Sequence, residues 1–580
     1  MPLILSFLLG LIEMMAIAIA GYGWANALPL NRRAGVFERL VLGFCFSVTC
    51  VLISACFVIL VRLPFQYVNY ASLALAIGLT SGWVYSSRHR VVACDGNLRK
   101  LSSYWLPLVL FSFHLILWAI YFGSYPFFPN TEPPDAVWHA QITLSVLQGA
   151  FTTPIGQAGF AGGAHILFAS MSTYFGESVI FVERATSAFV ESLSVLVAYC
   201  LFQNILPSKR AANYATVAFA LIVPAGFVYY ANVGAYPNIV GDFFVLVSLL
   251  VAVTIQDRLT VGSIATAVVV ETMALISHVS ALILLLLVVC FSLAVFNSYR
   301  SKFRNYVLSN LGFFLVPLAG VIVARSLVIR ELSYVFGFYL DLHNDLGLVL
   351  GAWVHNYLFL AGSINCILLM AAFVWAIVKM RSSIWPMFLA AWFGLLIILV
   401  FIGTQDWRMV LLSFVPGAGL LGILLSKLQQ GLENVIAQKI RAVRTRRVAV
   451  VASMLVLIVV LSAGGPSAYA LSHAFSNGQS VRQGNIYDSM VWLQANTPPN
   501  STVASVGIEL EYRYLPVVTT LIYAGDFPLN STGILKLQSS VSFNYVAVST
   551  GFIGLKTFHA SNAFRAEYQN ADVVIFRIAT

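Results

Sequence analysis

Long apolar segments separated by short polar connections run along most of the chain. Many of them approach the roughly 20 residues that a helix needs to cross a bilayer. They are continuous and lack a period of two, so they favour helices over the strands of a membrane barrel. We predict about fourteen transmembrane helices. Their expected ranges are 3–28, 38–61, 67–87, 104–123, 178–205, 211–230, 238–256, 260–277, 279–297, 305–325, 354–378, 384–403, 408–426 and 448–470.

Two parts of this pattern leave alternatives open. The segment 260–297 fits one broken helix pair or a re-entrant element. The N-terminus is apolar from residue 3 onward, with no basic region before it and no evident processing site. We expect it to be a retained span and not a cleaved signal peptide.

The largest polar interruption before the C-terminal tail runs from Gly123 to about Glu177. Pro133-Pro134 sets an extended approach, and Asp135 occupies the position of a helix N-cap. The run Asp135–Gly149 then predicts an amphipathic helix lying in the membrane interface. A second interfacial helix, Ala164–Phe175, follows a glycine-rich bend. On the first helix a polar line and an apolar line run side by side: Asp135, His139 and Thr143, and Trp138, Ile142 and Val146.

The last 110 or so residues have a different composition. A period typical of an amphipathic helix covers Asn485–Asn496, and Pro498-Pro499 ends it. Short β-rich runs follow at Thr502–Val506, Tyr545–Ser549 and Val573–Ile578. The predicted fold is therefore a polytopic α-helical membrane protein with a small C-terminal α/β domain, residues 472–580.

Charge is scarce, and its distribution predicts the topology. The 580-residue chain is 60% hydrophobic and 9% charged, with a mean hydropathy of +0.88 and a net charge of +10. Much of the positive charge lies in alternate short loops, so it predicts cytoplasmic loops and does not call for a nucleic-acid partner. The outer segments are then 124–177, 229–237, 326–353, 403–408 and the tail from 471. The basic clusters are Arg32/Arg33, Arg88/Arg90/Arg99/Lys100, Lys209/Arg210, Arg300/Lys302/Arg304, Lys379/Arg381 and Arg441/Arg444/Arg446/Arg447.

Some of the same charge favours contact with anionic membrane lipids. The seven cysteines all precede or include Cys366 and contain no CxxC pair, so the tail has no disulfide and no such metal motif is present. We expect a multi-pass protein of the plasma membrane, with the long loop and the tail extracytoplasmic.

Asp135 and His139 are the candidates for chemistry in the long outer loop. They stand one helical turn apart beside the bilayer, where Asp135 suits a general base and His139 a helper or metal ligand. The alternative is that Asp135 only caps the helix and His139 only faces water. Glu132 is separated from Asp135 by the two prolines, and its carboxylate is a further candidate for the same site.

This arrangement resembles the GT-C superfamily of membrane glycosyltransferases. The matching stretch is Glu132–His139 and the two helices after it, with further likeness in Ala274–Ala281 and in Asp406-Trp407-Arg408. The resemblance covers roughly residues 104–580, so residues 1–103 are three additional spans and residues 104–471 form the membrane core. The chain departs from oligosaccharyltransferases in lacking a WWDYG-like motif, and from protein O-mannosyltransferases in lacking a clear paired-acid signature.

The resemblance implies an inverting transfer of a sugar from a polyprenyl-phosphate-type lipid to the hydroxyl of a glycan, lipid or protein acceptor. A carboxylate accepts the hydroxyl proton, and cations stabilise the departing phosphate. Arg408 is the first candidate for the phosphate contact, although an ion pair with Asp406 is the alternative. His278 and Arg325 are further candidates. A divalent cation, Mg²⁺ or Mn²⁺, would be held by Asp135, His139 and His278.

Three other functions fit parts of the pattern. A transporter or flippase for a polar lipid or lipid-linked sugar would use the many spans and the intramembrane acids Glu191 and Glu271, but no internal symmetry is evident. An oligosaccharide ligase or polymerase would carry its large outer loop late in the chain. A noncatalytic assembly subunit would keep the scaffold without the chemistry.

Overall fold

The computed structural model describes most of the membrane region and the C-terminal sheet. The described residues are 2–28, 35–87, 104–124, 135–147, 162–176, 179–233, 235–256, 259–298, 300–329, 363–402, 406–439, 501–506, 518–523 and 543–579, with single positions between 485 and 538. Glu132, the predicted span 448–470 and the basic clusters at 32–33, 88–100 and 441–447 lie outside them.

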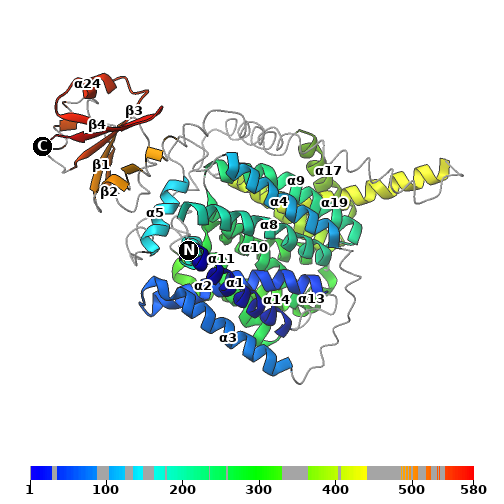
Figure 1. The fold of residues 1–580 in the computed structure, drawn as a ribbon. Coiled ribbons are helices and arrows are strands. Elements are labelled where there is room, and N and C mark those ends of the chain that lie inside the picture. The colour runs from blue at the N-terminus through cyan, green and yellow to red at the C-terminus, as the bar shows by residue number, and fades with distance from the viewer. Residues whose placement is uncertain are drawn as a thin grey trace. The chain divides into compact units, whose positions relative to one another are not determined.

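Apolar helices make up the first of two units (Figure 1). The chain forms one unit from residues 1–116, 145–229 and 237–471, and a second from residues 117–144, 230–236 and 472–580. The helices with their bounds are α1 (Pro2–Ala27), α2 (Val36–Leu60), α3 (Val68–Ser87), α4 (Trp105–Ser124), α5 (Asp135–Leu147), α7 (Gly163–Phe175), α8 (Val179–Ile205), α9 (Lys209–Val233), α10 (Tyr236–Ile255), α11 (Val261–Ser277), α12 (Ile283–Ser298), α13 (Phe303–Ser309), α14 (Leu311–Val323), α17 (Ser363–Lys379), α18 (Ile384–Ile402) and α19 (Asp406–Lys439).

Each predicted span up to residue 426 falls on one of these helices, or on a pair of them. Among the described residues, four helices are long and apolar enough to cross a membrane, and a fifth span is obtained if α13 and α14, bent by 62°, count as one. Several others, including α11 and α12, are apolar but shorter. Many large apolar side chains on these helices are exposed, as in Ile12 and Met15 of α1, which suits contact with lipid. The chain is therefore a multi-pass membrane protein, and the number fourteen stays a prediction.

The predicted segment 260–297 is interrupted near its middle. α11 ends at Ser277, His278 is extended, and a short 3-10 turn at Val279–Leu282 leads into α12. A broken helix pair and a re-entrant element both contain such a break, so the two alternatives left by the sequence stay open.

The N-terminal helices pack as a group with α7. α1 lies against α2 and α3, and α7 contacts α1, α2, α3 and α8. The Ser47 hydroxyl of α2 donates to the Ile17 carbonyl of α1 at 3.2 Å. Hydrogen bonds of this kind hold membrane helices together where the hydrophobic effect between them is absent. α1, α2 and α3 are thus packed directly on α7, the second helix of the predicted outer loop.

α19 extends well beyond the predicted end of its span at residue 426. Its polar second half is stabilised by side-chain pairs one turn apart, such as the Gln429 amide donating to the Glu433 carboxylate at 2.9 Å. Glu433 also pairs with Arg210 at the start of α9, with 3.1 Å between Nη1 and Oε2. Hydropathy alone missed these last turns because they are held by polar contacts.

The C-terminal unit contains a five-stranded sheet in the order β2-β1-β3-β5-β4. β1 pairs in parallel with β2 and β3, whereas β5 is antiparallel to both β3 and β4. Its core is apolar and includes Val546, Phe558 and Phe576. The predicted small C-terminal sheet and its three predicted strands are confirmed. The elements are β1 (Ser501–Val506), β2 (Val518–Tyr523), β3 (Tyr545–Ser549), α24 (Leu555–His559), β4 (Phe564–Gln569) and β5 (Val573–Ile578).

The predicted helix over 485–496 is helical at each position that the structure describes. It is tied to the β4–β5 turn through Asn485, whose amide donates to Asp572 Oδ2 at 2.7 Å. Asn570 Oδ1 accepts from the backbone N–H groups of Asp572 and Val573 at 3.0 and 2.9 Å, which fixes that turn.

Candidate active site

α5 begins at Asp135, the first helical residue after the two prolines. The predicted helix Asp135–Gly149 is therefore present over Asp135–Leu147, and its last two predicted residues lie outside the described residues. His139 is 3% exposed and Thr143 is fully buried, and the Thr143 hydroxyl donates to the His139 carbonyl at 3.0 Å. The expectation that His139 only faces water is wrong, because its side chain is buried. Asp135 shares the helical line of His139 and Thr143 through their spacing of four residues.

α7 confirms the second helix predicted in the loop, and its start is fixed by a close approach. A Cβ added at Gly163 would lie 2.8 Å from the Ile276 carbonyl oxygen, near the end of α11. Glycine lets the two backbones meet, and α7 consequently begins beside the segment that leads to His278. α7 ends at Gly176, whose φ of 66° is the left-handed conformation of a helix C-cap.

His165 on α7 is a buried imidazole that the sequence analysis did not select. It is fully buried, and its ring meets Phe168 edge to face at 6.5 Å between centroids. Burial lowers the pKa of the His165 imidazole to about 3, because the charged form would be desolvated. The neutral ring is therefore the form present at pH 7. Its place directly after the glycine-rich bend, two residues from Gly163, was the signal available in the sequence.

His278 occupies the break between α11 and α12. It is 1% exposed, and its carbonyl accepts from the Ala281 N–H at 3.0 Å. The prediction that His278 stands at a helix end is correct. α7 and α11 thus bring His165 and His278 onto adjacent segments of the same unit.

The remaining predicted site residues are placed only in part. Arg408 is the third residue of α19, two positions after Asp406, and its side chain is outside the described part of the chain. Arg325 is exposed, just beyond α14. Asp135 belongs to the second unit, whereas His278, Arg325 and Arg408 belong to the first. The convergence of these residues on one site is therefore a prediction.

The described residues do not reproduce the suggested cation site. No group of three His, Cys, Asp or Glu side chains among them is arranged to hold a metal ion. The side chains of His139 and His278 are both described, whereas the side chain of Asp135 is outside the described part of the chain.

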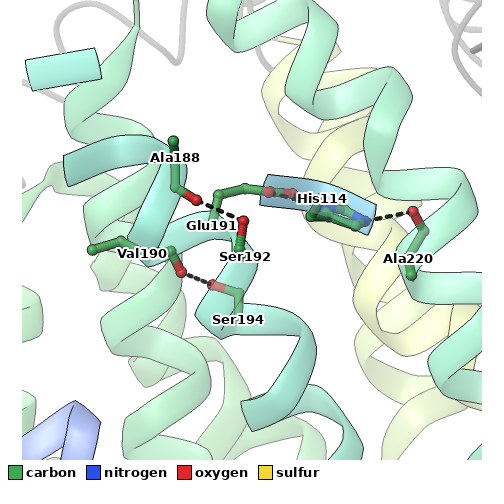
Figure 2. A network of polar contacts seen from close by, with 7 residues as sticks. All are labelled: His114, Ala188, Val190, Glu191, Ser192, Ser194 and Ala220. Carbon is green, nitrogen blue, oxygen red and sulfur yellow. Dashed lines mark hydrogen bonds and ion pairs between the residues drawn. The ribbon is translucent and has the colours of Figure 1, made fainter. Parts of the chain in front are cut away.

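The membrane region contains a buried polar pair that links three helices (Figure 2). His114 of α4 faces Glu191 of α8, with Nδ1 at 3.0 and 2.9 Å from the two carboxylate oxygens. His114 Nε2 donates to the Ala220 carbonyl of α9 at 2.8 Å. Both side chains are nearly inaccessible, 2% and 7% exposed. The intramembrane Glu191 noted in the sequence thus has a partner in a neighbouring helix, and His114 was the residue that sequence reasoning missed.

Comparisons with known proteins place the fold. No protein-family model and no curated protein matches the sequence. Among solved structures, the oligosaccharyltransferase of Archaeoglobus fulgidus in its apo form is similar with a TM-score of 0.52 and 14% identity, over 77% of this chain and 70% of that one. The same enzyme tethered to an acceptor peptide with the NVT sequon gives a TM-score of 0.50, 14% identity, and 78% and 70% coverage.

The arabinofuranosyltransferase AftD from Mycobacteria is also similar, with a TM-score of 0.50 and 13% identity. The similarity covers 82% of this chain but only 42% of AftD. Identities this low show a shared fold and do not by themselves transfer an activity. The resemblance inferred from the outer loop and its two helices is confirmed at the level of the fold.

Proposed function

We propose that this chain, which has the fold of the GT-C glycosyltransferases, is an integral membrane glycosyltransferase. It moves a sugar from a polyprenyl-phosphate-type lipid donor to an acceptor hydroxyl at the extracytoplasmic membrane surface. The observation that carries the proposal is α5, which begins at Asp135 within the predicted outer loop 124–177. The chain shares its fold with two enzymes whose names describe glycosyl transfer. One is an oligosaccharyltransferase tethered with an acceptor peptide, and the other is an arabinofuranosyltransferase.

In the proposed reaction, Asp135 accepts the proton of the acceptor hydroxyl while that oxygen attacks the anomeric carbon. The bond from the anomeric carbon to the phosphate oxygen breaks, and the lipid phosphate leaves with inversion. A general base contributes typically 10²–10⁴-fold to such a step. Glu132 is the second candidate carboxylate, and His139 supports this end of α5 from one turn away.

Cationic and imidazole groups stabilise the departing phosphate in this proposal. Arg408, at the start of α19, is assigned this role first, because a guanidinium matches phosphate geometry with two parallel hydrogen bonds. His278 and Arg325 are the further candidates. The described residues form no cation site, so no step is assigned to a bound metal, although Mg²⁺ or Mn²⁺ remains the candidate cofactor.

The test is turnover by the purified full chain in lipid nanodiscs. Polyprenyl-phosphate sugars extracted from the host membrane serve as donor, and released polyprenyl phosphate is measured by mass spectrometry. We expect Asp135→Asn to lower kcat about 10²- to 10⁴-fold with a smaller change in KM. Asp488→Asn is the matched control, since it makes the same change at an exposed carboxylate of the C-terminal unit. A folded Asp135→Asn variant with wild-type turnover would instead favour a transporter or an assembly subunit.

A further inference from the structure

A polar cavity lies between the additional N-terminal helices and α7. Its volume is about 490 Å³, within the range of roughly 300–1,000 Å³ that is usual for small-molecule sites. All of its lining belongs to the first unit. The residues come from α1, from the 3-10 turn Phe65–Tyr67, from the start of α3 and from the end of α7 with its C-cap: Gly10, Glu13, Gln66, Tyr67, Asn69, Tyr70, Thr173, Tyr174 and Gly176.

The backbone geometry of α1 opens this cavity. A Cβ at Gly10 would lie 2.6 Å from the Tyr174 carbonyl oxygen, so α1 passes directly beside the end of α7. Glu13 follows on the same face of α1, three residues further along. A carboxylate in an apolar membrane helix is costly and usually faces a polar interior or a ligand. The cavity gives Glu13 such a surrounding.

Two acceptors in the cavity have no hydrogen-bond partner among the residues that the structure describes. They are Oε2 of Glu13 and Oδ1 of Asn69, both buried. The Asn69 amide already donates to the Thr173 carbonyl at 3.5 Å, which leaves its oxygen for another donor. Buried acceptors that stay unpaired cost free energy. Their partner must therefore carry hydrogen-bond donors.

The rest of the lining distinguishes a hydroxyl-rich ligand from an ammonium. Gln66 and Tyr174 add neutral groups that both donate and accept, as sugar hydroxyls require. Tyr67 and Tyr70 stand at the exposed side, with ring centroids 6.0 Å apart and planes at 45°. Two tilted rings offer an apolar surface to the C–H face of a sugar, whereas quaternary ammonium ligands are enclosed by an aromatic cage.

We propose that this cavity is a binding site for a neutral saccharide, either a free glycan or the headgroup of a glycolipid. Glu13 and Asn69 accept from its hydroxyls, and the two exposed tyrosines cover one face of its ring. On the topology predicted from the basic loops, the cavity opens to the same side as α5 and α7. The lining of the cavity contains none of the residues assigned to catalysis, so the proposal does not depend on the catalytic assignment.

Saturation-transfer NMR on the full chain in nanodiscs measures the binding of each probe. The soluble probes are the methyl glycosides of mannose, glucose, galactose and arabinofuranose, together with maltose and trehalose. Octyl glucoside represents the lipid-linked source, and choline chloride represents an ammonium ligand. We expect saturable binding of at least one sugar. We expect Glu13→Gln to weaken it about tenfold, as a hydrogen bond to a charged group would suggest.

Three variants separate binding from folding and from catalysis. Tyr70→Ala removes a ring that is 70% exposed, so it should reduce binding with little effect on the fold. Glu433→Gln makes the same change as Glu13→Gln outside the cavity and should bind as wild type. Asp135→Asn should also bind as wild type. Absence of binding by every sugar, binding that survives both Glu13→Gln and Tyr70→Ala, or displacement of the sugar by choline would overturn the proposal.

Discussion

At the residue scale, the His114–Glu191 pair shows how the membrane core tolerates a carboxylate. Nε2 of His114 must donate, because a carbonyl only accepts, and Nδ1 meets both oxygens of Glu191. The pair satisfies its own hydrogen bonds across α4, α8 and α9 and presents little charge to its surroundings. Such a pair contributes mainly by keeping each partner satisfied.

Replacing His114 with leucine should therefore destabilise the protein by about 3–5 kcal/mol, because Glu191 is left buried without its partner. The double variant His114→Leu/Glu191→Leu should recover much of this loss. Denaturant unfolding in detergent micelles measures both values. Equal losses in the single and double variants would show that the contact contributes through packing alone.

His165 predicts a pH dependence of stability. Its pKa falls from about 6.5 in the unfolded chain to about 3 in the folded one. Between these values the unfolded chain binds a proton that the folded chain does not. The contribution of His165 to the free energy of unfolding is therefore fully present above pH 6.5. It falls by about 1.4 kcal/mol per pH unit as the pH decreases towards 3. His165→Leu should reduce this slope between pH 7 and 5. An unchanged slope would contradict the burial of a neutral imidazole.

At the scale of elements, the junction of α7 with α11 depends on the missing side chain of Gly163. Gly163→Ala should destabilise the protein by about 1–3 kcal/mol, because its Cβ would meet the Ile276 carbonyl at 2.8 Å. It should also lower turnover by displacing the segment that carries His278. Gly78→Ala on α3 is the control, since nothing lies within 4 Å of a Cβ there. Thermal unfolding measures the loss of stability, and the donor-turnover assay measures the loss of turnover.

Sequence patterns predicted the elements whose stability comes from their own periodicity. The apolar spans, α5 and α7, and the strands β1, β3 and β5 are of this kind. β2 and β4 were missed. Most residues of β4 are exposed and show no alternation, and the strand is fixed by its pairing with β5 and not by its composition. The His114–Glu191 pair was missed because its partners stand 77 residues apart.

The candidate site was predictable only as separate residues. Asp135 and His139 are linked by helical spacing, so the sequence places them on one line. Their relation to His278 and Arg408 depends on how distant segments pack, which hydropathy and capping signals do not encode. The cavity beside Glu13 could not be predicted from the sequence for the same reason, because α1, the turn before α3, α3 and α7 each contribute only a few residues to it.

At the scale of the membrane unit, helix ends that are predicted to be cytoplasmic gather together. Lys209 lies over the Tyr104 ring at 5.9 Å, and Arg210 pairs with Glu433. Asn297 and Ser298 both donate to the Arg381 carbonyl, at 3.1 and 3.2 Å. The first two contacts join the α8–α9 connection to the start of α4 and to the end of α19, and the other two join the α12–α13 connection to the α17–α18 connection. Helix ends that the basic loops place on one side of the membrane thus contact one another.

The proposed chemistry requires α5 to lie on the opposite side of the membrane from these basic helix ends. Ala136→Cys, introduced next to Asp135 into a chain whose seven native cysteines are replaced, can be labelled in sealed cells with a membrane-impermeant maleimide. Lys302→Cys, exposed among the basic residues, is the control for the other side. We predict that position 136 is labelled in intact cells and that position 302 is labelled only after permeabilisation. Labelling of position 136 only after permeabilisation would contradict an extracytoplasmic transfer by Asp135.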